Sequence, residues 1–256
     1  MDFFFIVIIS IIASFLTLFS GFGLGTLLLP AMLIILPSQE AVIATAIVHF
    51  LNNIFKFMIF GKSCKKDVLI KFGITAILAS FVGAKLLVTL ANLPPILNYE
   101  LLGYEKKILP LTFIISLLIL IFAIYDLYSV KQNLKFGKNF LPIGGLVSGF
   151  LGGLSGHQGA MRSAFLANAG LTKDSFIGTG VTIACLVDMA RITVYGLHIS
   201  SIGKEHIPLM TASCISALLG VFMGKHFLKT VTMEEIQKIV GIGLILLSIA
   251  LAIGII

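Results

Sequence analysis

The chain has 256 residues, of which 58% are hydrophobic and 11% are charged, whereas about 25% of the residues of a soluble domain are charged. Its 11 acidic and 18 basic side chains cannot cover the surface of a water-soluble globule, so the composition excludes that class. The net charge of +7 is dispersed and follows no nucleic-acid-binding motif. We therefore expect no nucleic acid partner, and we interpret the bases as orienting a polytopic protein in a lipid bilayer.

The first half of the chain contains five apolar segments, at residues 3–19, 26–36, 41–60, 68–91 and 108–127. A helix needs about 20 residues to cross a bilayer core, so the segment at 26–36 is too short to span alone. It follows a glycine-rich break that contains Gly21, Gly23 and Gly25. Glycine allows positive φ and close backbone approach, which suits a helix break that lines a polar cavity.

The second half repeats this plan, with apolar segments at residues 140–154, 160–171, 175–195, 207–228 and 236–256. Its short segment at 160–171 also follows a glycine-rich break, which contains Gly156, His157, Gln158 and Gly159. The spacing of 134 residues between Ser38 and Thr172 also separates Glu40 from Asp174 and Thr45 from Thr179. These ordered matches indicate an internal duplication.

Clusters of lysine predict the topology. Three lysines follow the third segment and three follow the fifth, at positions 62, 65, 66, 131, 135 and 138, and the positive-inside rule places both loops in the cytoplasm. Five segments separate the amino terminus from the central loop. Because five is odd, the second half starts from the opposite side, and the repeats are inverted. We expect both termini to lie outside the cell membrane.

The predicted fold is therefore an all-α, polytopic helical membrane protein built from two inverted repeats. Each repeat contains a glycine-broken helix or a re-entrant short segment, and the sequence leaves these two arrangements open. Residues 1–128 form the first transmembrane repeat, residues 129–139 a cytoplasmic basic linker and residues 140–256 the second repeat, within one membrane domain. The sequence also leaves open whether the molecule works as a homodimer.

Polar residues inside the membrane are costly and mark the candidate site. On the third segment, one helical face carries Thr45, His49, Asn52, Asn53 and Lys56. The corresponding segment of the second half carries an acid and a base three residues apart, Asp188 and Arg191, and Arg162 follows the second break. These side chains could form only a hydrogen-bonded packing seam and a structural ion pair. Three bases against one acid favour an anionic substrate over a cation.

The sequence resembles the TauE/SafE sulfite exporter family over nearly its whole length. The resemblance rests on GFGLG at residues 21–25 before LLP at 28–30, on ATAIVHFLNN at 44–53 and on the second glycine-rich break. It implies a small integral membrane transporter of inorganic sulfur anions or organosulfonates, with two repeats. We therefore expect a secondary transporter, most simply an exporter, that carries sulfite or an organosulfonate by alternating access. We expect neither enzyme activity nor a cofactor or metal.

The expected site combines both breaks with the polar faces. The predicted substrate-binding residues are Gly21, Gly23, Gly25, His49, Asn52, Asn53, Lys56, Gly156, His157, Gln158, Gly159, Arg162 and Arg191. Asp188 is the predicted proton-coupling carboxylate, which releases Arg191 when it is protonated.

Three alternatives remain open at this point. A cation or metal carrier would use His49, Asp188 and His157. A rhomboid-like intramembrane serine protease would use Ser155 of the sequence GLSG at 153–156. The third alternative is a purely structural subunit of a membrane assembly.

Overall fold

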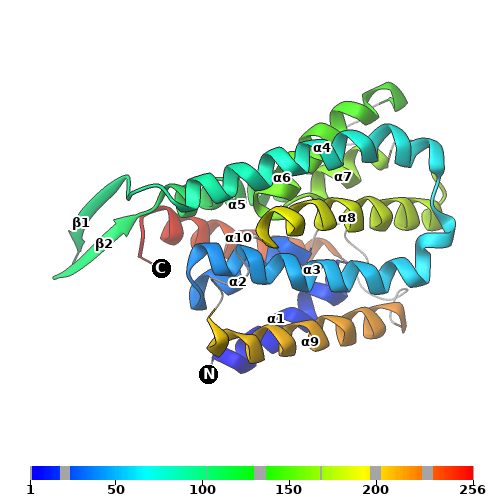
Figure 1. Cartoon of the computed structure of the whole chain (residues 1–256). Coiled ribbons are helices and arrows are strands. Elements are labelled where there is room, and N and C mark those ends of the chain that lie inside the picture. Colours follow the sequence, from blue (N-terminus) through cyan, green and yellow to red (C-terminus); the bar gives the residue numbers. More distant parts are fainter. Residues whose placement is uncertain are drawn as a thin grey trace.

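A computed structural model describes residues 2–17, 24–101, 103–129, 137–167, 169–196, 203–226 and 233–255. Within these ranges the chain forms ten α-helices and one two-stranded sheet (Figure 1). The helices of the first half are α1 Asp2–Leu16, α2 Leu24–Ile35, α3 Ser38–Phe60, α4 Lys66–Ala91 and α5 Pro110–Ser129. Those of the second half are α6 Leu141–Ser155, α7 Gly159–Leu166, α8 Lys173–Tyr195, α9 Ile207–His226 and α10 Met233–Ala252. Each helix matches one predicted segment, which confirms the all-α class.

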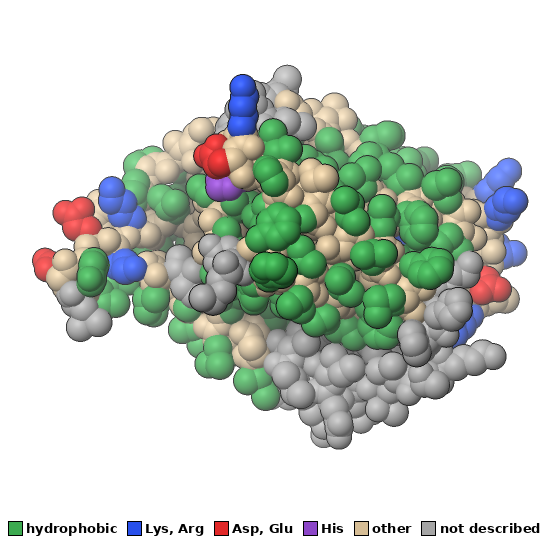
Figure 2. All heavy atoms as spheres, turned by 90° about the horizontal axis from the view of Figure 1, so that it is seen from below, with side chains coloured by type: hydrophobic (Ala, Val, Ile, Leu, Met, Phe, Trp, Pro, Cys, Tyr) green, Lys and Arg blue, Asp and Glu red, His purple; other side chains and the backbone are tan. Residues whose placement is uncertain are grey.

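The surface of the bundle is apolar, whereas its interior holds charged side chains. Phe4 and Met58 are 73% and 72% exposed, but Asp188 and Arg191 are completely buried. Hydrophobic side chains cover the middle of the molecule, and charged side chains lie mostly at its ends and edge (Figure 2). In the described part of the chain, four helical segments are long and apolar enough to cross a membrane, at Ser38–Ser63, Lys66–Ala91, Lys173–Tyr195 and Lys204–Gly224. The protein is therefore a multi-pass membrane protein.

Helices α6 and α7 form a re-entrant hairpin. Near its base, a Cβ atom on Gly144 would lie 2.4 Å from the ring of Phe165, so the end of α7 returns beside the start of α6. After the hairpin, a Cβ on Gly170 would lie 3.7 Å from Lys138 Cε, which precedes α6. The hairpin therefore enters and leaves at one end of the bundle. We call it the lysine-bearing end, because it carries Lys138 and the lysines at 62, 65 and 66.

Helices α1 and α2 form a second hairpin, which enters from the opposite end. The amino terminus lies at the end where α3 and α9 begin, and α2 returns toward that end (Figure 1). A hydrogen bond and a polar contact connect the helix starts there: Ser38 Oγ lies 2.5 Å from Thr112 Oγ1, and Glu40 Oε2 lies 3.8 Å from His206 Nε2. Both short helices thus turn back toward the end from which their hairpins enter, as in the re-entrant arrangement that the sequence left open.

Glycines allow two helix pairs to approach backbone to backbone. A Cβ on Gly83 of α4 would lie 2.2 Å from the carbonyl oxygen of Phe150 and 2.9 Å from the amide of Leu154, both on α6. A Cβ on Gly220 of α9 would lie 2.4 Å from the carbonyl oxygen of Ile11 on α1 and 3.1 Å from the amide of Phe15. The two interfaces therefore use the same pair of backbone atoms, a carbonyl and the amide four residues later.

The connection between α4 and α5 contains an antiparallel hairpin that the sequence analysis did not predict. Strand β1 (Leu97–Leu101) pairs with β2 (Tyr104–Ile108), and Gly103 at φ +81° makes the turn. Ile108, which we expected to begin the fifth helix, ends β2 instead, and α5 begins at Pro110. The connection contains no long apolar run, so a search for membrane-spanning segments assigns no element to it.

Candidate functional site

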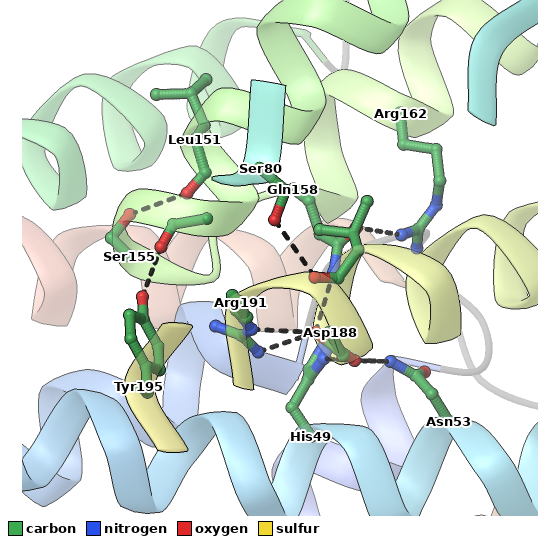
Figure 3. A network of polar contacts seen from close by, with 12 residues as sticks. His49, Asn53, Ser80, Leu151, Ser155, Gln158, Arg162, Asp188, Arg191 and Tyr195 are labelled. Carbon is green, nitrogen blue, oxygen red and sulfur yellow. Dashed lines mark hydrogen bonds and ion pairs between the residues drawn. The ribbon is translucent and has the colours of Figure 1, made fainter. Parts of the chain in front are cut away.

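Asp188 lies at the centre of a buried polar cluster (Figure 3). Its Oδ2 atom lies 2.6 Å from His49 Nδ1 and accepts a hydrogen bond of 2.8 Å from Asn53 Nδ2. Its Oδ1 atom accepts from Gln158 Nε2 at 3.2 Å and from Arg191 Nε at 3.0 Å. A carboxylate only accepts hydrogen bonds, so Nδ1 of His49 carries the proton of that pair. One acid thus connects α3, α8 and the tip of the α6–α7 hairpin.

Helical spacing explains how the sequence builds this cluster. His49 and Asn53 are four residues apart on α3, so they lie on one face and reach the same carboxylate oxygen. Asp188 and Arg191 are three residues apart on α8, where the guanidinium folds back onto the acid, with Nη2 2.8 Å from Oδ1. Gln158 comes from the break before α7 and joins the two helices.

The guanidinium of Arg191 keeps an unused donor that faces the hairpin tip. Nη1 is fully buried and has no hydrogen-bond partner among the described residues, and Nη2 touches Asp188 without being aligned to donate. A Cβ on Gly156 would lie 2.7 Å from Nη1, so only glycine leaves this approach open. Gly156 has φ +82°, which also requires glycine. Nη1 of Arg191 therefore faces the backbone of Gly156, where no side chain intervenes.

The two hairpins meet at the same place. A Cβ on Gly25, near the start of α2, would lie 3.1 Å from the carbonyl oxygen of Gly156. Beside it, His157 is held with Nδ1 3.0 Å from Ser155 Oγ, and its ring stacks on Phe122 of α5 with centroids 5.4 Å apart. Its Nε2 atom is buried and lacks a partner in the part of the chain that the structure describes. Two unpaired nitrogen atoms, from Arg191 and His157, thus border the meeting point.

The remaining predicted residues lie outside this first cluster. Asn52 donates to Ser14 Oγ at 3.0 Å, and Lys56 donates to Thr17 Oγ1 at 2.9 Å, so both turn toward α1. Arg162 reaches Asp188 only indirectly, through a hydrogen bond of 3.2 Å from Nη1 to Gln158 Oε1.

Some of the predicted glycines lie within the described residues, and two do not. Gly25 and Gly156 lie at the hairpin tips, and Gly159 is the buried first residue of α7. Gly21 and Gly23 fall outside the described residues.

Sequence reasoning missed several supporting side chains. Ser148 on α6 donates to the carbonyl of Gln158 at 3.0 Å, and Ser80 on α4 donates to the carbonyl of Val187 at 3.1 Å. Tyr195 donates to the carbonyl of Gly153 (Figure 3). Tyr195 lies one turn after Arg191 on α8, and this spacing is a signal that could have found it. The two serines are small residues in glycine-rich helices and carry no comparable signal.

The described residues include no group of three or more His, Cys, Asp or Glu side chains that could hold a metal ion. A cation or metal carrier is accordingly not favoured by the site. Among the described residues of the site, Asp188 is the only buried acid, and hydrogen-bond donors surround it.

Comparison with known families identifies the chain. A family model described as Sulfite exporter TauE/SafE matches residues 6–251. The chain belongs to the TauE/SafE family. No curated protein and no solved structure gave a match.

Membership of the TauE/SafE family confirms the resemblance found in the sequence and establishes the class of function. The protein is a membrane transporter of the sulfite exporter type and not an enzyme, and its partners are a small anion and the lipid bilayer. The family gives no support to a homodimer, and the protease is not favoured. Moreover, Ser155 is paired with His157 of its own hairpin tip at 3.0 Å, whereas a rhomboid dyad takes its histidine from another helix.

Proposed function

We propose that the protein exports a small sulfur-containing oxyanion, such as sulfite or an organosulfonate, and binds it where the two hairpin tips meet. The observation that carries this proposal is the buried Nη1 donor of Arg191, which faces Gly156 without a partner among the described residues. Leaving a buried donor of a charged group unsatisfied costs about 1–3 kcal/mol or more. An oxyanion supplies the missing acceptor, and a guanidinium suits planar or pyramidal oxyanions through two parallel hydrogen bonds.

The surroundings of Arg191 are suited to an anion in a further way. Helix α2 begins at Leu24, and the contact of Gly25 with Gly156 brings the amide groups of this helix start to the tip. Such amides and the positive end of the helix dipole attract negative charge. Asp188 is held by its contacts with His49, Asn53 and Gln158. It therefore fixes the position of the Arg191 guanidinium.

Asp188 is the coupling group in this proposal. As a carboxylate it holds Arg191 through Oδ1, at 3.0 Å from Nε and 2.8 Å from Nη2. Protonation would remove its charge and free the guanidinium to follow the substrate, and deprotonation would draw the guanidinium back. Proton transfer at Asp188 and anion binding at Arg191 are therefore linked, because the deprotonated carboxylate and the anion compete for one guanidinium.

Alternating access is supported by the way the halves pack. The hairpins enter from opposite ends, and α1 packs on α9 as α6 packs on α4, which are equivalent pairs under exchange of the halves. The equivalent contacts of Gly83 and Gly220 follow the same exchange. We infer that residues 1–128 and 140–256 are inverted repeats joined by the linker 129–139. Inverted repeats move against each other around a central site and open it to either side in turn.

The orientation proposed from the sequence fits this arrangement. The lysine-bearing end would face the cytoplasm of the cell, and both termini would lie outside the cell membrane. In this orientation the α6–α7 hairpin enters from the cytoplasm and the α1–α2 hairpin enters from outside.

Transport by proteoliposomes tests the proposal. Wild-type protein should accumulate radiolabelled sulfite when a pH gradient is imposed. Arg191→Gln and Asp188→Asn should each reduce this flux to background while remaining monodisperse. Lys85→Gln, which removes an exposed lysine of α4, is the matched control and should transport normally. Full flux by Arg191→Gln would refute the assignment of the anion site.

A further inference from the structure

Two further cations, one buried and one partly buried, lie between Asp188 and the lysine-bearing end. Lys56 of α3 is only 5% exposed, and its ammonium donates to Oγ1 of Thr17, the residue after α1, at 2.9 Å. Arg162 of α7 is partly buried and donates to Gln158 Oε1 at 3.2 Å. Arg162 lies on the far side of Gln158 from Asp188 (Figure 3). Neither cation touches the carboxylate.

Packing of α3 against α8 places these two side chains at similar depth. A Cβ on Gly178 of α8 would lie 2.4 Å from the carbonyl oxygen of Phe60, and Lys56 lies one helical turn before Phe60. A Cβ on Gly180 would lie 3.5 Å from Arg162 Nε, so Arg162 crosses α8 within the same stretch. Lys56 follows His49 by seven residues on α3, and Arg162 follows Gln158 by four residues on α7. Both cations therefore lie below residues that contact Asp188, on the side of the lysine-bearing end. Gly180 precedes Asp188 by eight residues, or about 12 Å of helix.

This second pair has no acidic partner. Within the described residues, neither Lys56 nor Arg162 forms an ion pair, whereas Arg191 is paired with Asp188 at 2.8 Å. Buried charges in proteins are normally paired, and unpaired bases inside a membrane mark the path of a charged substrate. Two cations that repel each other leave a position between them that an anion would stabilise.

We propose that Lys56 and Arg162 form a second site for the same oxyanion, on the path between the central site and the lysine-bearing end. The proposal rests on the transport function proposed above and adds a distinct place at which the substrate is held. Gln158 connects the two sites, because its amide donates to Asp188 Oδ1 while its carbonyl oxygen accepts from Arg162. An anion that draws Arg162 away therefore frees Gln158, which changes the hydrogen bonding of Asp188 before the anion reaches Arg191.

Equilibrium binding of radiolabelled sulfite to the purified full chain tests this site. At saturation the wild type should bind two sulfite ions per chain. Lys56→Gln and Arg162→Gln should each bind one, whereas Lys56→Arg and the exposed control Lys85→Gln should bind two. Arg191→Gln should also bind one, because it retains the second site. Since Arg162 is only partly buried, Arg162→Gln provides the test if Lys56→Gln does not fold.

Different failures have different meanings in this experiment. One sulfite ion per wild-type chain, lost in Arg191→Gln and kept in Lys56→Gln and Arg162→Gln, would overturn the second site and leave the central site intact. No sulfite bound to folded wild-type protein would overturn both proposals.

Discussion

Gly149 of α6 offers a test of how the hairpin is held against α4. A Cβ on Gly149 would lie 2.1 Å from the carbonyl oxygen of Ala76, and Gly145 and Gly153 make equivalent approaches of 2.2 Å and 2.1 Å to carbonyls of α4. Side-chain Cβ atoms essentially never approach another heavy atom closer than 3.0 Å. The substitution Gly149→Ala must therefore separate the helices by about 0.9 Å, the difference between 3.0 Å and 2.1 Å, since neither backbone can yield locally.

The expected result is a loss of both stability and transport. Overpacking of this kind costs about 1–3 kcal/mol, and alanine in a helix returns about 0.5–1 kcal/mol. The net effect on the free energy of unfolding is a loss of up to about 2.5 kcal/mol. The shift also moves the tip that carries Gly156 and Gln158 away from Asp188, so sulfite flux should fall.

A matched control separates packing from helix propensity. Gly243 of α10 has open space where its Cβ would lie, so Gly243→Ala should be neutral or stabilising. Thermal unfolding in detergent and flux in proteoliposomes measure the two effects. A Gly149→Ala protein as stable and active as Gly243→Ala would refute the packing of α6 on α4.

Three further substitutions or labels test other parts of the account. Asp188→Asn leaves Arg191 buried without its acid, which should destabilise the protein by about 3–5 kcal/mol; adding Arg191→Gln should recover part of this loss in thermal unfolding, and additive losses would contradict the pairing. Gly156→Ala forces a side chain into φ +82° and against Nη1, so it should cost about 1–2 kcal/mol and lower the binding of sulfite from two ions per chain to one, which equilibrium binding measures. Cys64, at the lysine-bearing end, should react with an impermeant maleimide only after the cells are opened; labelling of intact cells would reverse the proposed orientation.

The helices were predictable because the membrane sets their length and composition. Long apolar runs interrupted by lysine or glycine define each helix, and the structure follows the segments within a few residues. The β-hairpin was not predictable in the same way, because its pairing depends on a turn at Gly103 and on contacts with the end of α10, where Lys106 Nζ donates to the carbonyl of Ile255 at 3.0 Å. Contacts between distant segments have no local sequence signal.

The sequence predicted which residues belong to the candidate site, but not which of them contact one another. Polar residues in an apolar helix are conspicuous, so His49, Asn53, Asp188 and Arg191 could be named from their spacing alone. Their convergence on one carboxylate requires the packing of α3 on α8. The sequence analysis grouped Lys56 with these residues. The structure shows that the side chain of Lys56 turns toward α1 instead.

The central claim is that an oxyanion binds between Arg191 and the tip at Gly156. Selenite has the shape and charge of sulfite, and its selenium atom can be located by anomalous scattering. A crystal structure of the protein with selenite should show an anomalous peak within hydrogen-bond distance of Arg191 Nη1 and beside Gly156, and the peak should be lost in Arg191→Gln. Selenite bound elsewhere in the chain, with the guanidinium of Arg191 unoccupied, would contradict the account.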